Sequence, residues 1–73
     1  MFVLELRRGT ETHRFSVTSS RPAGWLLSEQ SNRQTIRTVR YRDWHRVERA
    51  IALIRHDAAA LEQQGWSMSA LAD

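Results

Sequence analysis

The feature that most constrains the fold is a series of apolar residues between positions 44 and 61, spaced three and four residues apart. This spacing places the side chains on one face of an α-helix. The members of the stripe are Trp44, Val47, Ile51, Ile54, Ala58 and Leu61, with Ala50 beside them. The stripe is wide enough to cover one face of a sheet, so the rest of the chain has to provide the layer on which it packs.

The residues on either side of the stripe are typical of helix ends. The carboxylate of Asp43 is suited to accept hydrogen bonds from the free amides of a first turn and to interact favourably with the helix dipole. Gly65 is typical of a left-handed residue that ends a helix, and Trp66 can then fold back onto Leu61 in a Schellman motif. We therefore expect a helix over residues 43–64.

Residues 2–8 and 12–18 alternate between apolar and polar side chains, which indicates two half-buried strands. Gly9 and Thr10 separate them, and glycine at the first turn position favours a type II′ hairpin. A two-residue turn there pairs Leu4 with Phe15 and Glu5 with Arg14. The predicted unit is an antiparallel hairpin.

A second hairpin is predicted from residues 24–30 and 33–41, joined by Ser31 and Asn32. On that register Leu27 lies opposite Ile36, and Trp25 lies opposite Thr38. The core side then carries Trp25, Leu27, Ile36 and Thr38, and the other side carries Leu26, Arg37, Val39 and Tyr41. A β-bulge would instead turn Val39 and Tyr41 inward.

Together these segments predict an α+β fold: a four-stranded antiparallel sheet of two hairpins, followed by one long C-terminal helix packed on one face. With 73 residues, the chain is expected to form a single ββββα domain over residues 1–66. Residues 67–73 are expected to be a short tail that either adds one turn capped by Ser67 or frays.

Several functional classes are disfavoured by the composition. The chain has no cysteine, which excludes disulfides and thiolate metal sites and favours a reducing, cytoplasmic location. The segment MFVLELRR lacks the long apolar run of a signal peptide, and no stretch predicts a membrane span. His45 and His56 are about 16 Å apart along a helix, too far to share a metal ion. We therefore expect neither metal nor cofactor, and no enzymatic activity.

All eleven basic side chains are arginine, and the formal net charge is +3. Arginine recognises phosphate and carboxylate groups through its planar fork and stacks on bases. The codon usage of a GC-rich genome would produce the same bias, so composition leaves both explanations open. The arginines of residues 35–66 are divided between the predicted sheet and the predicted helix and form no obvious continuous track.

The sheet face away from the helix is the first candidate interaction surface. On the expected register it displays apolar residues that water would not accommodate well, namely Val3, Leu26, Val39 and Tyr41. Leu53 lies on the outer side of the helix, among Arg46, Arg49 and Asp57, which suggests a contact outside the chain. These residues predict a small non-catalytic interaction module that forms a homodimer through the open sheet face or the outer helix face.

A single-stranded nucleic-acid-binding protein is the alternative. Arginines interleaved with an aromatic residue on an open sheet are suited to bind phosphates and to stack a base. The expected contacts are Arg7, Arg14, Arg37, Arg40, Arg42 and Tyr41.

Overall fold

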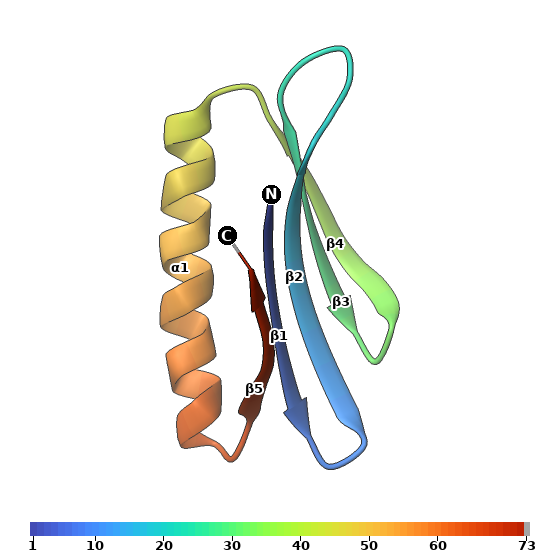
Figure 1. Ribbon diagram of the computed structural model, residues 1–73, viewed down its shortest axis with the longest axis vertical. Helices are drawn as coiled ribbons and strands as arrows, with labels where there is room; N and C mark the ends of the chain where they lie inside the picture. Colours follow the sequence, from blue (N-terminus) through green and yellow to red (C-terminus); the bar gives the residue numbers. More distant parts are fainter. Residues whose placement is uncertain (73) are drawn as a thin grey trace.

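A computed structural model describes residues 1–72 and shows a five-stranded antiparallel sheet with one helix lying along one face (Figure 1). The elements are β1 (Phe2–Arg8), β2 (Glu11–Ser19), β3 (Trp25–Ser31), β4 (Gln34–Tyr41), α1 (Trp44–Gln63) and β5 (Ser67–Ala72). The strand order across the sheet is β4-β3-β2-β1-β5. The predicted class, an antiparallel sheet with one helix packed on it, is confirmed.

The predicted number of strands was wrong, because residues 67–72 form β5 beside β1 (Figure 1). They neither add a helical turn nor fray; Asp73 lies outside the described residues. The reason lies in β1, whose Phe2, Leu4 and Leu6 are buried. β2 satisfies the backbone groups on one flank of β1, and β5 provides partners for those on the other flank.

The first hairpin forms as predicted. Leu4 pairs with Phe15 and Glu5 pairs with Arg14. Gly9 has a φ of 60°, in the left-handed region that a type II′ turn requires at its first central position.

The second hairpin differs from the prediction in both turn and register. Its central turn residues are Asn32 and Arg33, with φ of 52° and 69°, as a type I′ turn requires. Ser31 therefore pairs with Gln34, and an irregularity between Glu29 and Gln30 then shifts the register by one residue.

This irregularity reverses the faces of β4. Moving the turn by one residue alone would leave Val39 on its expected side, but a one-residue shift moves a strand's side chains to the opposite face. Val39 pairs with Leu27 and Tyr41 pairs with Trp25. Val39 and Tyr41 thus lie on the helix side, packed against the core, while Ile36 and Thr38 are exposed.

The helix begins and ends within one residue of the predicted limits. The His45 N–H donates to Oδ1 of Asp43 at 3.0 Å, so Asp43 is the N-cap. At the other end, the Trp66 N–H donates to the Leu61 carbonyl at 3.1 Å and the Gly65 N–H donates to that of Glu62 at 3.2 Å. This pair of bonds is the predicted Schellman motif.

The core lies between α1 and the sheet. Its buried members are Phe2, Leu4, Leu6, Phe15, Val17, Leu27, Val47, Ile54 and Ala58. Within residues 1–72, no helix combines the length and the apolar character that crossing a membrane requires.

Candidate functional site

The sheet face away from α1 is more polar than the sequence predicted. Ser16, Ser28 and Thr38 lie side by side across β2, β3 and β4 on this face. Val3 is only 7% exposed, between Ser16 and Ala72 of the adjoining strands. Because Val39 and Tyr41 lie on the opposite side, the expected apolar open face is not present.

The arginines of this face do not gather into one cluster. Nη1 of Arg14 lies 3.3 Å from a carboxylate oxygen of Glu5, and Arg40 donates to the Ser20 hydroxyl. Arg7 lies with Arg33 in a shallow hollow at the hairpin turns. These contacts place Arg7 and Arg14 apart from the basic residues of β4.

A second surface, which we call the arginine groove, lies between the edge strand β4 and the helix α1. It consists of two adjoining hollows. One has a volume of about 280 Å³, and the other, near the start of the helix, has a volume of about 460 Å³; Tyr41 and Arg46 line both. The residues that line the two hollows are Arg37, Arg40, Tyr41, Arg42, Asp43, Arg46, Arg49, Ala50, Leu53, Ile54 and Asp57.

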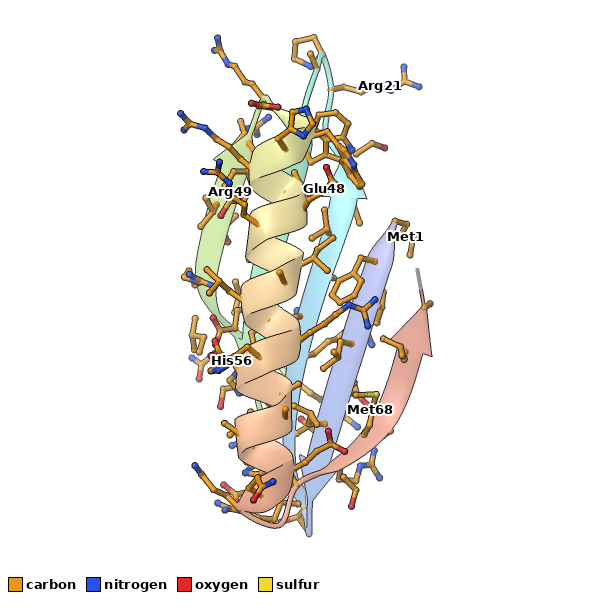
Figure 2. All side chains as sticks on the ribbon, turned by 90° about the vertical axis from the view of Figure 1, so that its left-hand side faces the viewer. Met1, Arg21, Glu48, Arg49, His56 and Met68 are labelled. Carbon is orange, nitrogen blue, oxygen red and sulfur yellow. The ribbon has the colours of Figure 1, made fainter. Side chains whose placement is uncertain are left out.

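Local structure explains why these side chains meet. Residues three and four apart on a helix share a side, so Arg46, Arg49 and Leu53 form one row along α1. Figure 2 shows Arg49 on the side of the helix that lies over β4, with Glu48 on the opposite side. The connection from β4 to α1 is short. Arg42 therefore lies at the end of the groove where the helix begins, beside Arg46.

The groove is rich in unpaired positive charge. Nε of Arg37 lies 3.1 Å from Glu29, but within residues 1–72 no carboxylate lies within ion-pairing distance of the side chains of Arg42, Arg46 or Arg49. Asp43 also lines the groove, where it accepts the His45 N–H.

Four of the residues predicted to contact nucleic acid come together here: Arg37, Arg40, Arg42 and Tyr41. Arg46 and Arg49, which the sequence analysis placed on the outer side of the helix, also line the groove. The expectation of no common track was therefore wrong. The sequence pattern did not predict that β4 is the edge strand beside the helix. This position brings the arginines of β4 and those of α1 to one groove.

Leu53 is 65% exposed, as the helical pattern predicts, and it forms part of the wall of the groove. The five residues predicted to form a homodimer interface differ in exposure: Leu53 is exposed, Leu26, Val39 and Tyr41 are partly buried, and Val3 is buried. Their contact with a partner stays a prediction.

None of the three histidines lines the groove. His13 is half-buried on the helix side of the sheet, where its Nε2 lies 2.8 Å from Glu29. His45 and His56 are exposed on α1, and their nitrogens lie 3.3 Å from Glu48 and 3.9 Å from Asp57. Among residues 1–72, no group of three potential ligands is placed to hold a metal ion.

Comparison with known proteins returned no match: no protein-family model, no curated protein and no solved structure is significantly similar to the chain.

Proposed function

We propose that this chain is a non-catalytic binding module whose arginine groove holds the phosphate backbone of single-stranded nucleic acid. The observation that carries the proposal is the convergence of Arg42, Arg46 and Arg49, without ion-pairing carboxylates among residues 1–72, on one groove. Three guanidinium groups in one place repel one another, and an anion that bridges them removes this repulsion.

The chemistry of arginine favours phosphate as that anion. Each guanidinium offers a planar fork of N–H donors that matches two phosphate oxygens. Arg37 and Arg40, on the β4 side, extend the basic lining along the strand. A chain of phosphates along the groove would meet basic side chains from both walls.

The apolar part of the groove favours a single strand over a duplex. Tyr41, Ala50 and Leu53 lie among the arginines, and such side chains offer contact surface to an unstacked base. In a duplex the bases are stacked on one another, so these side chains would gain little contact.

The absence of a catalytic role is also part of the proposal. His45 and His56 are more than four-fifths exposed, and a general base in such a position is not shielded from water. Association through the sheet face has little support, because Val39 and Tyr41 lie on the helix side.

The test is the fluorescence anisotropy of a labelled single-stranded oligonucleotide of mixed sequence, titrated with protein at several salt concentrations. For the wild type we expect affinity to fall log-linearly with salt because counterions are released. The triple variant Arg42→Gln, Arg46→Gln, Arg49→Gln should bind at least about tenfold more weakly at low salt. Its salt slope should be smaller by about 2, because each phosphate that is no longer neutralised lowers the slope by about 0.7.

The matched control is the triple variant Arg7→Gln, Arg21→Gln, Arg33→Gln. It removes the same number of charges from positions outside the groove, so it should reduce affinity only through the long-range field, by less than about threefold. Equal reductions in affinity in the two triple variants, or no binding by the wild type, would contradict the proposal that the arginine groove binds the oligonucleotide. Equal affinity for a duplex of the same length would overturn the assignment to single strands.

A further inference from the structure

The outer edge of β5 carries backbone N–H and C=O groups that have no partner strand among residues 1–72. β5 pairs with β1 on one side, and among residues 1–72 no strand pairs with its other side. All six of its residues are exposed, and Ser67–Ala72 contains neither charge nor proline. Charged residues, proline and β-bulges are the usual protections of an edge strand, and an edge that lacks them is a template on which another strand adds. β5 has only a local register irregularity, without charge or proline.

β5 also extends the apolar side of the sheet beyond the helix. Met68 and Leu71 pair with Leu6 and Leu4, whose side chains are buried under α1. An irregularity in the register of β5 lets two residues three positions apart lie on this same side. Met68 is 39% and Leu71 50% exposed, and Figure 2 shows Met68 on the side of the helix opposite to Arg49.

These features define the chemistry of the partner. It is an extended strand without charge, because β5 offers no ion-pairing group. It also carries apolar side chains on the helix side, because Met68 and Leu71 need cover there. β5 itself meets both requirements, so the edge is complementary to a second copy of itself.

We propose that β5 pairs antiparallel with β5 of a second copy, about a two-fold axis that passes near Ser69 and Ala70. This axis is perpendicular to the sheet, so both helices lie on the same face of one continuous ten-stranded sheet. Met68 then lies beside the partner subunit's Leu71, and Leu71 lies beside the partner subunit's Met68.

The distribution of charge supports this arrangement. Each copy has a formal net charge of +3, and the arginine groove lies at β4, on the opposite edge of the sheet from β5. Joining the copies at β5 keeps the two grooves at the far ends of the assembly, where their repulsion is weakest. The contact between six-residue strands is small compared with the ~1,200 Å² of the smallest stable interfaces. The dimer is therefore expected to need a high protein concentration.

The first test is sedimentation equilibrium without nucleic acid, from low micromolar to millimolar protein. The wild type should gain mass with concentration, whereas Leu71→Lys should stay monomeric because each copy would place an uncompensated charge against the partner subunit's Met68. Leu53→Lys is the matched control, since Leu53 is also an exposed leucine but lies on α1, away from β5; it should associate like the wild type. A wild type that stays monomeric throughout, or a Leu71→Lys variant that associates as the wild type does, would overturn the proposal.

The second test locates the contact and does not depend on the stability of Leu71→Lys. The chain has no cysteine, so Ala70→Cys introduces a single thiol beside the proposed axis. Under mild oxidation it should form a disulfide-linked dimer much faster than Thr38→Cys, an exposed position on β4. Equal rates for the two variants would place the contact elsewhere and contradict the proposal.

Discussion

Nε2 of His13 lies 2.8 Å from Oε2 of Glu29, across the neighbouring strands β2 and β3 on the helix side of the sheet. Both side chains are 18% exposed. The second oxygen of Glu29 lies 3.1 Å from Nε of Arg37 in β4. One carboxylate thus connects three adjacent strands, at the end of the sheet where the hairpins turn.

Replacing this carboxylate should reduce stability. We expect Glu29→Ala to lower the free energy of unfolding by about 1–3 kcal/mol, because His13 and Arg37 would be left without a partly buried charged partner. The measurement is urea denaturation followed by circular dichroism. Glu11→Ala is the control: its ion pair with Arg8 is about half exposed, so its removal should cost no more than about 1 kcal/mol. Equal effects would contradict the role given to Glu29.

The register of β4 can be tested with two adjacent residues. Val39 packs against the core, whereas Thr38 is exposed on the opposite face. Val39→Asp should lower the free energy of unfolding by more than about 2 kcal/mol, because it places an unpaired carboxylate against apolar neighbours. Thr38→Asp should change it by less than about 0.5 kcal/mol. The opposite order would show that β4 lies on the predicted register with Ile36 and Thr38 inward.

The approach of Gly24 to β4 predicts a costly substitution. A Cβ on Gly24 would collide with the backbone oxygen of Tyr41, whereas one on Gly9 would meet no atom within 4 Å. Both glycines have positive φ, so alanine at either site should cost about 1–2 kcal/mol of backbone strain. Gly24→Ala should cost a further 1–3 kcal/mol or so from overpacking. Thermal denaturation of the two variants measures the difference, and similar melting temperatures would argue against the close approach.

The wall of the arginine groove can be tested without unfolding the protein. Leu53→Glu places a negative charge among Arg46, Arg49 and the proposed phosphates, so we expect at least about tenfold weaker binding of a single-stranded oligonucleotide. The exposed position predicts a change in stability of less than about 0.5 kcal/mol. Ala52→Glu is the control, because position 52 is one turn from Glu48, on the other side of α1. Equal reductions in affinity would show that net charge alone accounts for the binding.

Local patterns predicted the elements that depend on local chemistry. The stripe from Trp44 to Leu61, the cap at Asp43 and the Schellman motif at Gly65 define α1 almost to the residue. The first hairpin was equally predictable, since a two-residue turn beginning with glycine leaves one register that pairs Glu5 with Arg14.

The features that were missed depend on contacts far along the chain. The short segment Ser67–Ala72 has little strand pattern of its own, because its register irregularity places Met68 and Leu71 on one side. The face of Tyr41 could not be derived from alternation either, since one extra residue near Glu29 reverses it. The arginine groove follows from both the edge position of β4 and that reversal, so only the assembled fold reveals it.

The pairing of β1 with β5 affects how the protein folds during translation. The most deeply buried strand leaves the ribosome before the other elements of the sheet, but one of its flanks has no cover until residues 67–72 have been made. During that interval the nascent chain exposes an apolar strand with free amides and carbonyls, which is the kind of surface that chaperones bind and that promotes aggregation. Completion of the native sheet therefore waits for β5 to be synthesised.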